Sequence, residues 1–188
     1  DILKDRQTLK ATAPARRSAQ TAMHRILAAL TRMFAPILCH TMEEVWDFLP
    51  GRDAESVHLA AWPKAEDLAP DPKWEHVFKV RTEVYRELEK LRAAKQIGKS
   101  LEAKVTIHAT APETAKALRE TDLREIFIVS EAAVVDAPVG PECADVKGLS
   151  VRVEKSALPK CERCWNLRAD VGRSPAHPAL CLRCVEVL

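Results

Sequence analysis

Glycine, aromatic residues and long apolar runs are all scarce in this sequence. Five glycines occur in 188 residues, and none of them builds the Gly-rich loop with which many enzymes hold a nucleotide phosphate. Aromatic residues make up only 5% of the chain. No run approaches the roughly 18 apolar residues that a membrane-spanning helix needs. Charged residues are spread through the N-terminal part, which is not typical of a secretory signal. We therefore expect a cytoplasmic protein with no membrane partner.

The residues that are present favour long amphipathic helices. Hydrophobic residues make up 47% of the chain, enough to bury a core in one large domain or a few small ones. Apolar residues recur at three- and four-residue steps over 19–37 and again over 74–91, which predicts two long helices. The stretch "HTMEEVWDFLPG" predicts a short helix from Thr41 to Leu49, in which Thr41 is the N-cap and Glu44 completes a capping box.

The apolar pattern changes from helical to strand-like after residue 100. Residues 101–109 alternate between apolar and polar, which predicts a half-buried strand, and "IFIVSEAAVVD" and "LSVRV" read as further strands. The stretch "TAPETAKALRE" reads as a helix that Thr110 and Glu113 open with a second capping box. The predicted fold class is mainly α with a small α+β unit. The predicted domains are a helical segment over 1–70, a long helix with a small α+β junction over 71–155, and a cysteine-rich tail over 156–188, with a Pro- and Asp-rich connection over 51–72.

Basic and acidic residues alternate in blocks along the chain, although the formal net charge is only +2. Lys and Arg outnumber Asp and Glu in residues 1–40, 77–110 and 155–188, and the reverse holds in the two segments between them. Separate basic patches are typical of a protein that binds a polyanion. The same blocks are also typical of the solvated faces of helices. Charge alone leaves both interpretations open.

Four of the six cysteines form two C-x-x-C pairs, "KCERCW" and "LCLRCV". A tight turn between two cysteines directs both sulfurs to one point, and two such turns complete a tetrahedron, so the spacing predicts a structural site for one Zn²⁺. Iron accepts four thiolates as well, and His177 offers a nitrogen ligand, so both stay open. A redox role is not favoured, because the βαβ context of such motifs is missing. The predicted ligands are Cys161, Cys164, Cys181 and Cys184, whereas Cys39 and Cys143 are predicted to be buried apolar side chains.

A tryptophan and several basic residues surround the predicted metal ligands. Four thiolates around Zn²⁺ carry a formal charge of −2, which Lys160, Arg163 and Arg183 partly offset. Trp165 directly follows a ligand. It either shields the metal site or offers a flat ring on which an unpaired base stacks, with Arg163 or Arg168 reaching a phosphate.

Six stretches together resemble the C-terminal region of bacterial isoleucyl-tRNA synthetases. They are "PARRSAQTA", "RMFAPIL", "HTMEEVWDFLPG", "SVHLAAWP", "VRTEVYRELEKLRAAKQIGKSLEAKVTI" and the two cysteine pairs, in this order. The resemblance spans essentially the whole chain. It implies the end of a helical anticodon-binding domain, a junction and a zinc-binding tail. Because the sequence begins at Asp1 without a methionine, we expect a fragment of a longer chain.

The resemblance implies a tRNA-recognition fragment of an enzyme that attaches isoleucine to its tRNA with ATP. Neither the HIGH-type nor the KMSKS-type signature of ATP binding occurs here, so ATP would bind only in the missing catalytic domain, and no catalytic residue is predicted in this chain. The implied partners are the anticodon stem-loop of isoleucine tRNA and the rest of the parent chain, and we expect a monomer. The implied RNA contacts are Arg16, Arg17, Lys160, Arg163, Trp165, Arg168 and Arg183.

Two other functions fit part of these features. The zinc motif also resembles the finger of formamidopyrimidine-DNA glycosylases, but members of that family begin with a catalytic proline and this sequence begins with Asp1. A zinc-stabilised protein-interaction module would need no nucleic acid at all. A phosphate-binding protein must lose tRNA affinity steeply as salt rises, whereas an interaction module would show no such loss.

Overall fold

The computed structural model of the chain describes residues 2–65 and 69–188. These residues form two compact units. The helical unit is Ala11–Ala69, and the mixed unit joins Asp1–Lys10 to Pro70–Leu188. The N-terminal residues thus belong to the unit that contains the cysteines, and the division into 1–70, 71–155 and 156–188 stays a prediction. Residues 66–68 of the predicted connection lie outside the described residues.

The helical unit is built from α2 (Pro14–Phe34), α3 (Cys39–Asp47) and the short 3-10 helix η1 (Val57–Leu59). Proline at the first position starts α2, where its missing N–H costs no hydrogen bond. Trp46 is fully buried and donates from its indole nitrogen to the Ala54 carbonyl over 3.0 Å. The core of the unit is small and consists of Ala35, Trp46, Leu49 and Val57.

The predicted capping box of α3 is wrong. The helix begins at Cys39, so Thr41 lies inside its first turn, and no side chain caps it. A hydrogen-bonded turn directly follows α2, in which the Leu38 N–H donates to the Phe34 carbonyl over 2.8 Å. The Leu38 carbonyl then accepts from the Met42 N–H over 2.8 Å, which opens α3 without a side-chain cap. Cys39 is exposed, so the prediction that this thiol is buried is wrong too.

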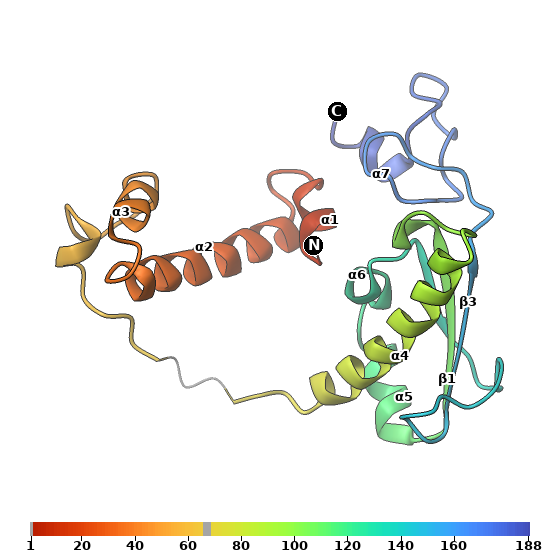
Figure 1. Ribbon diagram of the computed structural model, residues 1–188. Coiled ribbons are helices and arrows are strands. Elements are labelled where there is room, and N and C mark those ends of the chain that lie inside the picture. Colours follow the sequence, from red (N-terminus) through yellow and green to blue (C-terminus); the bar gives the residue numbers. More distant parts are fainter. Residues whose placement is uncertain (1, 66–68) are drawn as a thin grey trace. The chain divides into compact units, whose positions relative to one another are not determined.

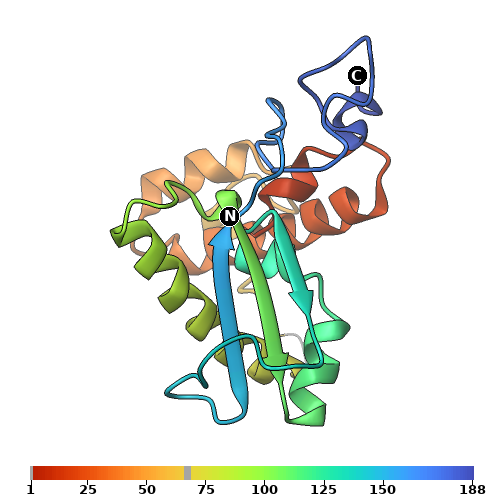
Figure 2. The same cartoon turned by 90° about the vertical axis from the view of Figure 1, so that its right-hand side faces the viewer.

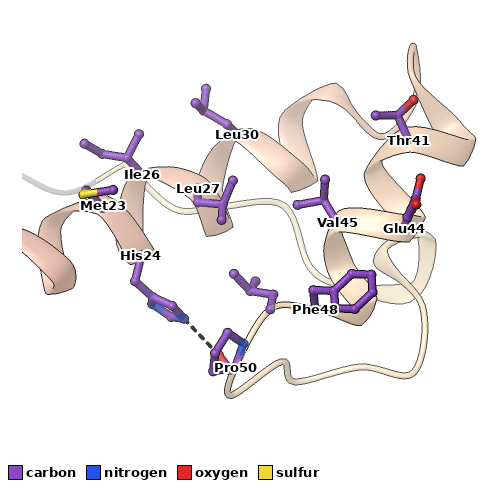
Figure 3. A pocket seen from close by; sticks show the side chains of 11 residues that line it. Met23, His24, Ile26, Leu27, Leu30, Thr41, Glu44, Val45, Phe48 and Pro50 are labelled. Atoms are coloured by element: carbon purple, nitrogen blue, oxygen red, sulfur yellow. Dashed lines mark hydrogen bonds between the residues drawn. The ribbon is translucent and has the colours of Figure 1, made fainter. Parts of the chain in front are cut away.

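An apolar groove of about 730 Å³ lies between α2 and α3 (Figure 3). Met23, Ile26 and Leu27 line it from α2, and Phe48 follows α3 with 82% of its surface exposed. His24 closes one end, where its Nε2 lies 2.9 Å from the Pro50 carbonyl oxygen. The buried residues of α2 are Ala19 and Thr31, so within the described residues most of the predicted apolar stripe faces solvent.

The mixed unit contains a three-stranded sheet in the order β2-β1-β3. Its strands are β1 (Ala103–Ala109), β2 (Glu131–Val134) and β3 (Leu149–Lys155). β1 pairs with β2 in parallel and with β3 antiparallel, and Val105 of β1 lies opposite Ala132 and Val153. Figure 2 shows the three strands side by side. The alternation predicted for 101–109 matches β1, in which Ala103, Val105 and Ile107 are buried.

Three helices of the mixed unit contact strands of the sheet, and α4 and α5 lie beside it in Figure 1. They are α4 (Lys73–Ala93), α5 (Pro112–Arg119) and α6 (Leu123–Phe127). Pro72 lies at the N-cap position of α4, and an Asp71 carboxylate oxygen just before it accepts the Lys73 N–H over 3.0 Å. The main core joins the inner faces of these helices and the sheet. Its fully buried members include Val77, Val80, Val84, Leu88, Val105, Ile107, Leu118, Phe127 and Leu149.

Two predictions for this unit are wrong in detail. Helix α5 has no side-chain cap, so Thr110 and Glu113 do not form a capping box. The stretch predicted as one strand from Ile126 begins as the end of α6, because Asp122 caps that helix through the Arg124 N–H and Ile128 ends it in the left-handed region. The strand starts only at Glu131. The overall prediction of a mainly α chain with a small α+β unit is confirmed.

The cysteine tail, residues 156–188, consists mostly of turns and ends in the short helix α7 (Leu182–Val185). The short helix α1 (Lys4–Gln7) belongs to the same compact unit. The 3-10 helix η2 (Ser100–Glu102) directly precedes β1. Among the described helices, none is both long and apolar enough to cross a membrane.

Gly148 directly precedes β3, and its substitution tests this fold. Its φ of 74° lies in the left-handed region, and an added Cβ would clash with the Thr110 hydroxyl. We expect Gly148→Ala to lower the free energy of unfolding by about 2 kcal/mol or more, from backbone strain and this clash. Gly140→Ala is the matched control, because nothing lies within 4 Å of its added Cβ. Urea denaturation with equal losses for both variants would contradict this reading.

Candidate functional site

The four predicted cysteine ligands converge on one point in the tail. All four sulfur atoms lie within 4.8 Å of one another, and the Sγ atoms of Cys164 and Cys181 are 3.9 Å apart. A tetrahedral zinc site with Zn–S bonds of about 2.3 Å has S–S edges of about 3.8 Å, so this donor set fits Zn²⁺. Cys161, Cys181 and Cys184 are buried. His177 is not part of the cluster.

Backbone hydrogen bonds shape the first cysteine pair into a tight turn. The Trp165 N–H donates to the Cys161 carbonyl over 2.9 Å, and the Cys161 N–H donates to the Asn166 carbonyl over 2.9 Å. This turn requires the left-handed region at Trp165, whose φ is 64°. In the second pair, the Cys184 N–H donates to the Cys181 carbonyl over 2.9 Å. The metal ligands therefore stand on two short turns rather than on long elements.

The cysteine thiols differ in their pKa values before a metal binds. Burial raises the pKa of the Cys161 thiol, but N–H groups of Cys164, Cys181 and Arg163 outweigh burial and lower this pKa to about 6. Burial raises the pKa of the Cys181 thiol to about 12. Because only thiolates bind Zn²⁺, binding at neutral pH releases protons from the thiols with raised pKa values.

Residues near the N-terminus hold the tail through ionic contacts. The Asp5 carboxylate accepts two hydrogen bonds from the Arg183 guanidinium, one of them of 2.7 Å, and a third from the Asn166 amide over 2.9 Å. Burial alone would raise the pKa of Asp5, but these donors hold it below its ordinary value. The hydrogen bonds that Arg183 donates to the Asp5 carboxylate raise the pKa of Arg183 further above its ordinary value. The Arg163 guanidinium donates to the Thr8 carbonyl over 2.9 Å.

The three arginines predicted as RNA contacts in the tail are thus engaged within the protein. Arg183 binds Asp5, and Arg163 binds the Thr8 carbonyl and approaches the Cys184 sulfur to 3.7 Å. The Arg168 Nε donates to Asp170 over 3.0 Å. This pair holds the pKa of the Asp170 carboxyl below its ordinary value against the effect of burial. Arg163 and Arg183 therefore join the tail to the N-terminal residues, whereas Arg168 makes a contact within the tail.

The predicted residues Lys160 and Trp165 lie together on the surface of the mixed unit. The Trp165 indole is 46% exposed, and the Lys160 ammonium is 5.8 Å from its ring centre. Two residues that no sequence pattern singled out join them, because the ammonium groups of Lys99 and Lys4 lie 4.8 and 5.7 Å from the same ring centre. The four residues come from three distant segments, so only the fold reveals their proximity.

The remaining two predicted RNA contacts lie in the helical unit. Arg16 and Arg17 occupy the first turn of α2, where Arg17 is exposed and Arg16 is half-buried. They belong to a different compact unit from the tail. The predicted set of seven residues is therefore divided between the two units, with two in the helical unit and five in the tail.

Two protein families match this chain. Residues 1–107 match the family described as "Anticodon-binding domain of tRNA ligase", and residues 159–187 match "Zinc finger found in FPG and IleRS". The second match contains all four converging cysteines. Together with the geometry, this match confirms the prediction of one structural zinc.

Several bacterial proteins resemble the chain over almost its whole length. A protein named isoleucine–tRNA ligase from Pseudomonas fluorescens is 45% identical over 99% of this chain, and one from Syntrophotalea carbinolica is 44% identical over 100%. A third, from Pseudomonas paraeruginosa, is 46% identical over 99%. The chain spans only 21% of the length of each of these relatives.

Removal of the metal tests the role of the cysteine cluster. We expect one zinc per chain by elemental mass spectrometry, and we expect a chelator to unfold residues 156–188 while the sheet survives. The reason is that the hydrophobic cluster of the tail consists of the cysteines themselves, Val171 and Leu180.

Acidification to about pH 5 should also release zinc, since protons compete for the thiolates. Amide NMR spectra distinguish tail from sheet, and Cys143→Ser is the control that keeps its zinc. A tail that stays folded without metal would contradict this role.

Substitution of Asp5 tests the contact between the N-terminal residues and the tail. We expect Asp5→Ala to destabilise the docked tail by about 2 kcal/mol, because Arg183 then loses its charged acceptor in a partly buried site. Asp136→Ala is the matched control, since the carboxylate of Asp136 is 93% exposed and its pair with Arg119 contributes about 0–1 kcal/mol. Hydrogen exchange of the tail amides measures both effects. Equal protection of the tail in both variants would show that Asp5 does not anchor it.

Proposed function

Because the chain belongs to the anticodon-binding domain family of tRNA ligases, we propose that it is the tRNA-recognition portion of an isoleucine–tRNA ligase. In this proposal the parent enzyme attaches isoleucine to its tRNA with ATP, and the residues described here bind the anticodon stem-loop. The chemistry takes place in parts of the parent protein outside this chain. The parent works as a monomer in the cytoplasm.

The observation that supports this proposal most directly is an exposed indole fixed beside a zinc site. Trp165 follows the ligand Cys164 and sits on the turn that the metal holds rigid. An unpaired base stacks on such a ring with about 1–3 kcal/mol, and nearby ammonium groups attract phosphate. Anticodon bases are unpaired, so they are suited to this mode of binding.

The basic start of α2 supplies a second candidate contact with the RNA backbone. Arg16 and Arg17 stand next to each other in its first turn, and Arg17 is exposed. Arginine pairs with phosphate through its planar fork, which gives affinity without base specificity. We assign these two residues to the sugar-phosphate backbone rather than to the bases.

The rival functions explain fewer observations. A DNA-repair glycosylase would share the zinc finger, but it gives no reason for the match of residues 1–107 to an anticodon-binding domain. A protein-interaction module likewise gives no reason for the match of residues 1–107 to that domain. The synthetase function accounts for both features.

Binding of tRNA at increasing salt tests the proposed function. We expect the 188-residue chain to bind isoleucine tRNA more tightly than valine tRNA, with log affinity falling linearly with log salt as phosphate contacts release counterions. Fluorescence anisotropy with labelled tRNA measures both properties. Arg17→Glu should weaken binding of both tRNAs by a similar factor, and Arg119→Glu, which lies on α5, is the charge-matched control. Weak binding that does not depend on salt would favour the interaction module.

A further inference from the structure

Residues 2–10, here called the N-terminal strap, are attached to the main core of the mixed unit. Ile2 packs against that core. The Arg6 guanidinium donates to both oxygens of the Glu125 carboxylate of α6 over 2.6–3.1 Å. The Glu125 side chain is only 18% exposed, so this ion pair is partly shielded from water. The strap therefore has an anchor on the core that does not involve the cysteine tail.

The same strap also binds the cysteine tail. The Asp5 carboxylate accepts hydrogen bonds from the Arg183 guanidinium over 2.7 Å and from the Asn166 amide over 2.9 Å. The Thr8 carbonyl accepts a hydrogen bond from the Arg163 guanidinium over 2.9 Å. Three side chains of the tail thus donate to acceptors that the strap provides.

Each of these three side chains also lies beside a metal ligand. Arg163 directly precedes Cys164, and the Nη1 atom that donates to the strap is also 3.7 Å from the Cys184 sulfur. The Nδ2 atom of Asn166 that donates to the strap also donates to the Cys164 carbonyl over 3.3 Å. Arg183 directly precedes Cys184. The strap and the turns that carry the ligands therefore share donors.

The charge of the metal site gives these donors a further task. Four thiolates around Zn²⁺ carry a formal charge of −2, and charged N–H groups beside the sulfurs offset part of it. Hydrogen-bonding partners outside the ligand shell orient the ligands, and their loss typically lowers metal affinity by a factor of about 10–100. An arginine has a long and flexible side chain, so it serves this purpose only when an acceptor fixes its position. In this tail the strap supplies the acceptors.

A second contact between the tail and the core provides a comparison. The Ser130 hydroxyl accepts the Leu167 N–H over 2.7 Å and donates to the Leu101 carbonyl over 2.5 Å. This contact docks the tail on the core, but it involves neither a cysteine nor an arginine beside the sulfurs. The tail thus has an attachment to the core besides the strap. What the strap adds is contact with the donors at the metal ligands.

We infer that the N-terminal strap is the outer part of the zinc site. The Asp5 carboxylate is a positioning group that holds Arg183 beside the thiolates, and it acts on the metal only through such donors. The Thr8 carbonyl does the same for Arg163. Because a docked strap strengthens metal binding, bound metal stabilises the docked strap by the same factor. Zinc therefore orders the part of the strap that follows Arg6 as well as the tail. This linkage concerns the metal site and is tested without RNA, so its failure and that of the proposed function are distinguishable.

The zinc affinity of the whole chain tests the first half of this linkage. We expect Asp5→Asn to lower the zinc association constant about tenfold or more, because Arg183 is then no longer held beside the sulfurs. Asp5→Glu keeps the carboxylate and should recover part of the loss. Lys10→Gln is the control within the same strap, since Lys10 and its partner Glu186 are 54% and 68% exposed. Competition with a chromophoric chelator measures the affinities, and equal values for Asp5→Asn and the unchanged chain would overturn the inference.

Cobalt in place of zinc reports on the sulfur atoms directly. Co²⁺ bound by thiolates has a sulfur-to-metal charge-transfer band in the near ultraviolet. A charged N–H group beside a sulfur lowers the energy of the sulfur electrons, so its loss moves this band to longer wavelength. We expect such a shift for Arg163→Met, because its Nη1 lies near the Cys184 sulfur, and a smaller shift for Asp5→Asn. Lys10→Gln should leave the band unchanged. A strap that only attached the tail would shift the band in none of the variants, and this result would overturn the inference.

The order of the strap without metal tests the second half of the linkage. Thr8 and Leu9 follow the Arg6 anchor, and their N–H groups close the turn of α1. We expect removal of zinc by a chelator to lower the backbone order parameters of Thr8 and Leu9 from about 0.85 to below about 0.6, the values of rigid and flexible backbone. Val105 is the internal control, because it is buried in the main core. Nitrogen-15 relaxation of the whole chain measures all three residues, and unchanged order at Thr8 and Leu9 would overturn the linkage.

Discussion

Convergence of four cysteine sulfurs on one metal ion is the constraint on which the structure of the tail depends. The tail has no apolar core of its own beyond Val171, Leu180 and the cysteines, so hydrophobic burial cannot order its turns. A closed tetrahedral shell can, because it fixes two turns at once. One of these turns carries Trp165, and the metal thereby determines where the indole lies. The zinc is structural, and its role is to fix the position of these turns.

A second constraint joins the two ends of the chain. Asp5 and Thr8 hold Arg183 and Arg163, so residues more than 150 positions apart in the sequence form one ionic cluster. The same N-terminal residues lead directly into α2 of the helical unit. Lys10 adds a contact to Glu186 at 4.0 Å. The N-terminal residues that contact the tail therefore also precede α2 in the sequence.

The sequence predicted those features that local patterns determine. Residue periodicity identified α2, α4 and β1, and the spacing of the cysteines identified the metal ligands, because both signals depend on neighbours along the chain. The capping boxes at Thr41 and Thr110 were wrong, because Thr41 lies inside the first turn of α3 and α5 begins at Pro112 after Ala111, with no side-chain cap at either helix. No sequence pattern identified Lys4 and Lys99, because only the tertiary structure brings them close to Trp165. A lone lysine carries no local signal that separates it from a solvated one.

Arginine and lysine have different tasks in the mixed unit, and the difference follows from their chemistry. The guanidinium groups of Arg6 and Arg183 donate two or more hydrogen bonds each to one carboxylate through their planar forks, and Arg168 donates one to Asp170. The lysines around Trp165 keep compact, hydrated charges on flexible stems. Such charges adapt to a mobile single strand without disturbing the fold. In the proposed function, release of RNA would leave the tail intact, because its internal contacts use arginines rather than these exposed lysines.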